Sequence, residues 1–236
     1  MAGELFEETA GTVLAVYAHP DDPDVSCGGS LARWARLGSE VHVVICTSGD
    51  KGTTDASADP AELAGRRVEE ATAAGAVVGL AGQQLLGFPD GELPEEELRA
   101  RLVALIRRIR PATVLCPDPT AVFFGEDYFN HRDHRVVGFA ALDALAPAAA
   151  LPLYFPEAGP AHRAERALLS GTLAPTVWVD ITGTIDEKVA AVGCHRSQFA
   201  GDGDAADRVV RLRAEEEGRR AGVAYAEGFR RLRLGG

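Results

Sequence analysis

The 236-residue sequence is short of positive charge and of long apolar runs. It has 24 Lys and Arg against 35 Asp and Glu, a formal net charge of −11, and its only lysines are Lys51 and Lys188. This balance argues against non-specific nucleic-acid binding, which depends on neutralising phosphates with Lys and Arg. No apolar run approaches the roughly 18 to 20 residues of a membrane helix, and the acidic stretch 1–9 lacks the basic and apolar regions of a secretory signal. We therefore expect a cytoplasmic protein with neither a nucleic-acid nor a membrane partner.

Cysteines are few and scattered. Cys27, Cys46, Cys116 and Cys194 form no C-x-x-C pair, a spacing that suits neither a zinc ribbon nor a small disulfide scaffold. Because no export signal is present, we expect four reduced thiols. The composition is 46% hydrophobic and 25% charged, which is typical of a globular protein, and the length fits one domain over 1–236.

Short apolar runs alternate with helical patterns through the first half of the sequence. The expected strands lie at 12–19, 41–47, 84–88 and 112–116, and the expected helices at 30–37, 60–78 and 95–110. The last of these helices has acids in its first turn and arginines in its last turn, as the helix dipole favours. The alternation predicts an α/β, Rossmann-like fold with a mainly parallel sheet and helices on both faces.

The second half of the sequence is less regular. We expect helices at 135–146, 185–195 and 207–222 and strands at 153–155 and 177–180. No repeat or linker splits the chain, so the sequence predicts one domain with a smaller, irregular C-terminal half. Both nucleotide fingerprints are missing, because no G-x-G-x-x-G follows the first strand and 27–30 does not form a P-loop.

Chemistry-bearing residues gather directly after the first expected strand. His19, Asp21, Asp22 and Asp24 lie within six residues, at the strand end where an α/β sheet places its ligands. Carboxylates this close repel one another unless a cation is present. Imidazole with carboxylate is a normal ligand set for zinc or iron. The alternative is a solvated acidic turn.

A second cluster, His131, Asp133 and His134, follows the fourth expected strand. Two histidines three residues apart at the start of a helix can face the same way. One shared cation explains both clusters, because a catalytic metal needs three protein ligands and an open position. Surface histidines beside an N-capping Asp are the alternative.

The two clusters contain motifs of a known family. Residues 18–22 read A-H-P-D-D and residues 131–134 read H-x-D-H, and the sequence thereby resembles the LmbE-like (PIG-L) zinc-dependent deacetylases. The likeness continues through 27–47, 67–79, 86–91 and 186–198. Members of this family remove acetyl groups from N-acetylglucosamine-type substrates, and some act in mycothiol, bacillithiol or natural-product pathways.

The resemblance implies a role for each motif residue. His19, Asp22 and His134 would be the zinc ligands, with Fe²⁺ as the alternative metal, and Asp21 would be the general base. His131 would stabilise the oxyanion and help the amine to leave, for which we expect a protonated imidazole.

Three further residues match family positions, and each has a structural alternative. Asp133 would orient an imidazole through its distal N–H, or else cap the helix that follows it. Arg67 and Asp90 match positions that face the sugar. Alternatively, Arg67 pairs with Glu70 on its own helix, and Asp90 belongs only to a turn.

The sequence departs from the family pattern at two places. Pro23 stands where the common motif has Glu. Phe129 stands where the mycothiol-pathway enzymes carry a catalytic Tyr, and Tyr128 is one position away.

We expect a zinc hydrolase that removes an N-acetyl group from an N-acetylglucosamine-type or related glycosidic substrate, in actinobacterial-type thiol or natural-product metabolism. Its partner would be a small molecule, an acetylated amino sugar, and a homo-oligomer is compatible with the sequence. One alternative is an amidase or esterase for a larger metabolite, with the aromatic loop 117–129 either as its apolar wall or packed into the core. A catalytically silent metal-binding protein of a biosynthetic cluster is another.

Overall fold

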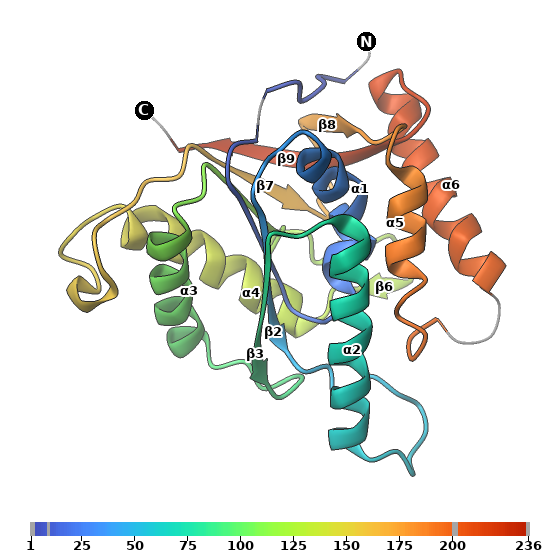
Figure 1. Cartoon of the computed structure of the whole chain (residues 1–236), viewed down its shortest axis with the longest axis horizontal. Helices are drawn as coiled ribbons and strands as arrows, with labels where there is room; N and C mark the ends of the chain where they lie inside the picture. The colour runs from blue at the N-terminus through green and yellow to red at the C-terminus, as the bar shows by residue number, and fades with distance from the viewer. Residues whose placement is uncertain (1–2, 9, 200–202, 235–236) are drawn as a thin grey trace.

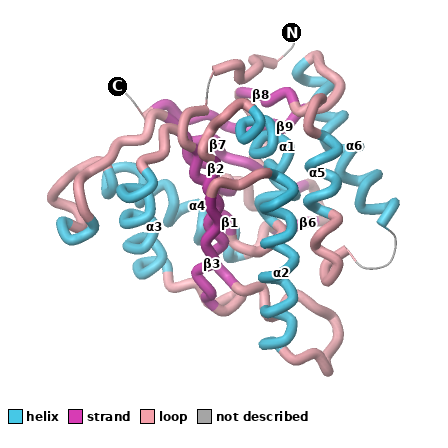
Figure 2. Tube along the Cα trace, viewed as in Figure 1, coloured by secondary structure: helices cyan, strands magenta, loops and turns pink. Residues whose placement is uncertain are grey.

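The computed structural model describes residues 3–8, 10–199 and 203–234. A seven-stranded sheet with the order β3-β2-β1-β4-β7-β9-β8 forms its centre, with helices on both sides (Figures 1 and 2). The strands are β1 Val13–Tyr17, β2 Val41–Thr47, β3 Gly82–Phe88, β4 Thr113–Pro117, β7 Arg166–Ser170, β8 Val177–Asp180 and β9 Ala226–Arg233. Strands β3, β2, β1, β4 and β7 are parallel, and β9 pairs antiparallel with both β7 and β8. The predicted Rossmann-like fold is therefore confirmed.

Each face of the sheet has its own hydrophobic core. The helices are α1 Asp22–Arg36, α2 Pro60–Val78, α3 Glu95–Ile109, α4 Arg132–Asp143, α5 Ile185–Val192 and α6 Gly203–Ala221. Side chains of α1, α2, α5 and α6 build the core of one face, and those of α3, α4 and the turn η1 Ala144–Ala149 build the other. None of the described helices has the length and apolar character needed to cross a membrane.

The second half differs most from the sequence prediction. The strand expected at 153–155 is wrong, because these residues lie in turns before the short helix η2 Pro156–Ala158 and Leu153 is 92% exposed. Strands β7 and β9 were not predicted. In β9 charged residues outnumber apolar ones, so its sequence lacks the apolar run of a central strand, yet it lies between two other strands.

Helix α1 begins eight residues before its predicted start at 30, directly at Asp22, and bends at Cys27. Beyond the bend, Gly29 lies against Ile181, where a Cβ atom would stand 2.7 Å from Cδ1 of that residue. The Glu227 carboxylate of β9 accepts hydrogen bonds from the backbone N–H groups of Gly29, at 3.1 Å, and Ser30, at 2.8 Å. A carboxylate at this place satisfies N–H groups that the bend leaves free. Strand β9 thus fixes the helix whose first residue is a predicted metal ligand.

Parallel pairing places the predicted site residues along one edge of the sheet. The segments that follow β1, β2 and β3 all leave at the carboxyl ends of their strands, and α4 starts beside them after the hairpin β5 Phe123–Phe124 and β6 Tyr128–Phe129. This is the edge at which open α/β sheets bind ligands.

Candidate metal centre and active site

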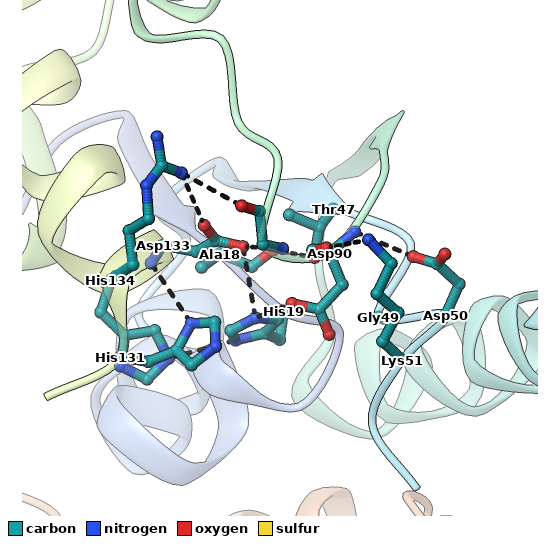
Figure 3. A network of polar contacts seen from close by, with 12 residues as sticks. Ala18, His19, Thr47, Gly49, Asp50, Lys51, Asp90, His131, Asp133 and His134 are labelled. Atoms are coloured by element: carbon teal, nitrogen blue, oxygen red, sulfur yellow. Dashed lines mark hydrogen bonds and ion pairs between the residues drawn. The ribbon is translucent and has the colours of Figure 1, made fainter. Parts of the chain in front are cut away.

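The three predicted metal ligands converge. His19 Nδ1 lies 3.1 Å from His134 Nε2 and 3.3 Å from Asp22 Oδ2, and His134 Nε2 lies 3.2 Å from Asp22 Oδ1. Figure 3 shows the His19 and His134 rings meeting beside His131. A tetrahedral zinc site with bonds of about 2.0–2.1 Å places its ligand atoms about 3.3–3.4 Å apart. The three groups therefore fit one metal ion.

The outer nitrogen of each of the two histidines has an acceptor. His19 Nε2 lies 3.1 Å from Asp90 Oδ1, and His134 Nδ1 lies 3.0 Å from Asn130 Oδ1. Since both acceptors need an N–H, they direct the lone pairs of His19 Nδ1 and His134 Nε2 toward each other and toward Asp22. Two lone pairs and a carboxylate that face one another require a cation between them. This donor set is that of a zinc or iron site.

Charge at the site favours the same conclusion. Burial lowers the pKa of His19, but the carboxylates of Asp22 and Asp90 outweigh burial and raise this pKa to about 10. Burial raises the pKa of Asp22, yet His134 and His19 hold it well below its usual range. The metal-free site therefore stabilises one positive charge at His19, where a proton and a metal ion compete.

A second group of potential ligands shares His19 with the first and adds Asp90, His131 and Asp133. Two of these already bind backbone. His131 Nδ1 accepts from the Asp133 N–H at 3.2 Å, and Asp133 Oδ2 accepts from the Gly91 N–H at 2.7 Å. The triad of His19, Asp22 and His134 is therefore the better metal site.

The local sequence explains how two ligands fit into one turn. Asp22 is the first residue of α1, and its carboxylate accepts from the His19 N–H at 2.7 Å. Pro23, the departure from the family pattern, lies in the first turn of this helix, where a missing N–H costs no intrahelical hydrogen bond. The turn accommodates Pro23 without displacing Asp22.

Asp21 forms an ion pair with Arg67. Arg67 donates to Asp21 Oδ1 at 2.7 Å and to the Gly49 carbonyl at 3.0 Å, and its side chain is almost completely buried. The alternative pairing of Arg67 with Glu70 is wrong, because Glu70 accepts from Ser197 instead. The buried guanidinium holds the predicted base in one orientation.

The structure also changes what two aspartates contact. Asp90, predicted to face the sugar, bonds to the His19 ring, and Asp133, predicted to orient an imidazole or cap the helix, binds the turn at Gly91. Asp133 Oδ2 is 3.8 Å from His19 Nε2, a longer approach than that of Asp90. The cap of α4 is His131, so the capping alternative for Asp133 is wrong.

His131 presents an exposed ring next to the triad, with its centroid 4.9 Å from that of His19. Burial and the charge of His19 lower its pKa, and Asp133 and Asp90 only partly offset them. This direction is opposite to the one expected for His131, whose protonation in the metal-bound enzyme stays a prediction. Because Nδ1 accepts the capping hydrogen bond, the neutral ring carries its proton on Nε2, and any added cation lowers this pKa further.

Several residues that hold the side chains of the site in place were not identified from the sequence. Asn130 orients His134 and also donates to the Ala121 carbonyl at 2.8 Å. Lys51 donates to the Asp90 carbonyl at 2.7 Å, and Asp50 accepts from the Asp90 N–H at 2.9 Å (Figure 3). The sequence offered one indication of Asp50 and Lys51, which is that they follow the second strand and so lie at the same edge of the sheet as the site.

A buried pair also supports α1 behind the site. Asp24 Oδ2 lies 2.8 Å from His195 Nε2, and both side chains are buried. The pair ties the first turn of α1 to the segment after α5, so the start of α1 is held at two points along the chain.

The hairpin β5–β6 shows whether the aromatic residues of the loop 117–129 form an apolar wall or pack into the core. Tyr128 and Phe124 line a cavity of about 1000 Å³ that reaches Asp22 and His134. Phe129 instead lies under the Arg135 guanidinium, 4.9 Å from its ring centroid, and is 55% exposed. These rings are not core residues, and Phe124 and Tyr128 are the two that line the cavity beside the site.

Comparisons with known proteins agree with the motifs. Residues 14–145 match the family model described as PIG-L, GlcNAc-PI de-N-acetylase. The chain is 35% identical over 224 residues to the diacetylchitobiose deacetylase of Thermococcus kodakarensis, covering 92% of this chain and 82% of that protein. It is 34% identical over 177 residues to the 1D-myo-inositol 2-acetamido-2-deoxy-alpha-D-glucopyranoside deacetylase of Rhodococcus erythropolis, covering 64% and 58%. The solved structure of N,N'-diacetylchitobiose deacetylase from Pyrococcus horikoshii, complexed with its inhibitor MPG, superposes with a TM-score of 0.86 at 33% identity, over 95% of this chain and 84% of that chain.

We predict one tightly bound metal ion per chain, which His134→Ala should abolish because it removes one of three ligands. Elemental analysis of the purified proteins measures this. The matched control is His162→Ala, since His162 bonds to the Pro111 carbonyl at the opposite edge of the sheet. Full retention of metal in His134→Ala would overturn the ligand assignment.

Metal binding should release about one proton at neutral pH, because the pKa of His19 in the metal-free protein is about 10 and the metal needs bare Nδ1. The affinity should fall about tenfold for each pH unit below about 10. Conversely, the raised pKa stabilises the metal-free protein below pH about 6.5, and this stabilisation is lost as the pH rises through about 10. Calorimetric titration in buffers of different ionisation enthalpy counts the protons, and a count of zero would contradict the prediction.

Proposed function

The chain belongs to the PIG-L (LmbE-like) family of de-N-acetylases, and on that premise we propose that it is a metal-dependent hydrolase that removes the N-acetyl group of an N-acetylglucosamine-type glycoside. The observation that carries the proposal is the convergence of His19, Asp22 and His134 beside an Asp21 carboxylate that Arg67 holds in place. The relatives named above act on N-acetylglucosamine units, which supports this substrate class.

Zn²⁺ is the metal that we propose, with Fe²⁺ as the alternative. Two imidazoles and one carboxylate would hold it and leave a position open, as in catalytic zinc sites. When bound, the ion supplies a Lewis acid that polarises the amide carbonyl and activates water.

The chain's own residues would handle the protons. Asp21 accepts a proton from the attacking water as the new C–O bond forms, and then returns it to the nitrogen as the C–N bond breaks. Acetate and a free amine result. Arg67 keeps Asp21 oriented between the two transfers through its 2.7 Å contact. One carboxylate can serve both steps because it is restored at the end.

His131 would act as a hydrogen-bond donor rather than as an acid. Its neutral ring has Nε2–H free while Nδ1 accepts from the Asp133 N–H. Such a donor stabilises the negative charge that develops on the carbonyl oxygen. A neutral imidazole does not give up its last proton near neutral pH, so the proton for the amine comes from Asp21.

Two alternatives remain from the sequence. An amidase or esterase for a larger metabolite would share the site and differ in substrate, so acetate release from N-acetylglucosamine and N,N'-diacetylchitobiose separates it from a deacetylase. A silent metal-binding protein would bind metal and hydrolyse nothing. The setting that we propose is actinobacterial-type thiol or natural-product metabolism.

Asp21→Asn should retain metal and lose about 10²- to 10⁴-fold in kcat/KM for N,N'-diacetylchitobiose, because the amide keeps the Arg67 contact but accepts no proton. Asp22→Asn should lose the metal itself, and exposed Asp127→Asn should change neither property. Amine release and metal content are measured on the same preparations. Metal loss in Asp21→Asn equal to that in Asp22→Asn would mean that the two roles are reversed.

His131→Asn separates capping from catalysis. Asn is a good N-cap, so this variant should keep the thermal stability of the wild type, whereas His131→Ala should lose about 0.5–2 kcal/mol. Both variants should bind metal and lose about 10²-fold in kcat. Because burial and the charge of His19 lower the pKa of His131, we expect neither variant to remove a basic limb from the pH profile. Disappearance of that limb would show that His131 works as an imidazolium.

A further inference from the structure

A groove opens at Asp22 and His134 of the metal triad, and Arg67 does not line it. Its volume is about 1000 Å³, and it runs from Asp22 and His134 along α6 to the loop between β7 and β8. Ligand pockets span about 300–1000 Å³, so an acetyl methyl group alone would leave this one almost empty.

Apolar side chains make up the larger part of the groove's lining, beside polar and charged ones. Val25 lies one helical turn after Asp22, and Val210 of α6 is buried further along. Toward the opening, Tyr128 is 50% exposed, Leu173 60% and Val209 48%. Exposed apolar residues that line one continuous cavity indicate an apolar ligand.

Four of the charges that border the groove form two ion pairs, and Arg213 and Glu216 border it as well. Lys188 Nζ lies 2.5 Å from Glu227 Oε1, and Arg220 lies 3.1 Å from Glu217. An apolar chain in the groove would leave these pairs intact, so binding it does not require separating them.

Asp22, Asn130 and His134 are the residues of the site that line the groove. Asp21, Arg67, Asp90 and Lys51 do not line the groove. Under the proposed function, Asp21 gives its proton to the amine, which places the amino sugar on its side of the metal triad. The acyl part of the same amide then points the other way, into the groove.

We propose that the groove binds an extended apolar acyl chain, so that the substrates of this enzyme include N-acyl amino sugars with acyl groups longer than acetyl. This inference rests on the proposed function and specifies its substrate class. Hydrolysis would break the same C–N bond, with water as co-reactant, and release a fatty acid and the free amine.

The test compares kcat/KM for the N-acetyl, N-butanoyl, N-hexanoyl and N-octanoyl derivatives of glucosamine with metal-loaded enzyme. Each fully buried methylene can add up to about fourfold, which corresponds to about 0.8 kcal/mol. We expect at least a tenfold rise from acetyl to hexanoyl. Leu173→Glu should reduce the hexanoyl-to-acetyl ratio at least fivefold. The control is Leu212→Glu on α6, 61% exposed and outside the groove, which should leave the ratio unchanged.

A binding measurement is independent of turnover. Calorimetric titration of N-octanoylglucosamine into metal-free protein should give a negative heat-capacity change, which Leu173→Glu should diminish. If every amide is inert while this binding persists, the proposed function fails and the apolar groove stands.

Three results would overturn the inference. The first is efficient hydrolysis of the acetyl derivative with slower turnover of each longer chain, which would leave the proposed function intact. The second is absence of octanoyl binding. The third is an oligomer, seen by light scattering, that Leu173→Glu dissociates without any dependence on chain length, because a second copy of the chain would then occupy the groove.

Discussion

The site depends on a concentration of negative charge around one buried imidazole. Asp22 approaches His19 from the helix that follows β1, and Asp90 approaches it from the turn that follows β3. Two carboxylates and a ring in so small a space are stable only when a cation joins them. The parallel sheet brings these groups together, since β1, β2 and β3 all end at the same edge. The orientation of His19, whose outer nitrogen faces Asp90, follows from this arrangement.

Support for the site comes from polar side chains that each bind one residue of the site and a second group elsewhere. Arg67 fixes Asp21, Asn130 fixes His134, and Lys51 fixes the turn that carries Asp90. Each contact is a directed hydrogen bond from a side chain held by another element, so each catalytic group keeps one orientation before substrate arrives. Preorganisation of this kind lowers the cost of reaching the transition state, because few groups must move.

The sequence predicted the strand that ends at His19 and the convergence of two motifs, because apolar runs and ligand residues are local signals. It did not predict which aspartate would touch His19, since Asp90 and Asp133 lie in separate loops whose distance depends on the whole sheet. The sequence could not predict that the pKa of His131 is lowered, because this shift depends on the neighbouring charge of His19. Strand β9 was missed because its charged residues find partners only in the folded sheet, as Glu227 does with Lys188.

The Glu227 contact joins two parts of the chain that the ribosome makes at very different times. The A-H-P-D-D motif emerges early from the ribosome, yet the carboxylate that caps the second half of its helix lies 198 residues further along the chain from Gly29. Until β9 has been translated and inserted between β7 and β8, the N–H groups of Gly29 and Ser30 lack this carboxylate acceptor. The residues of the candidate metal site at 19–22 are therefore synthesised long before the carboxylate that supports the bend behind them.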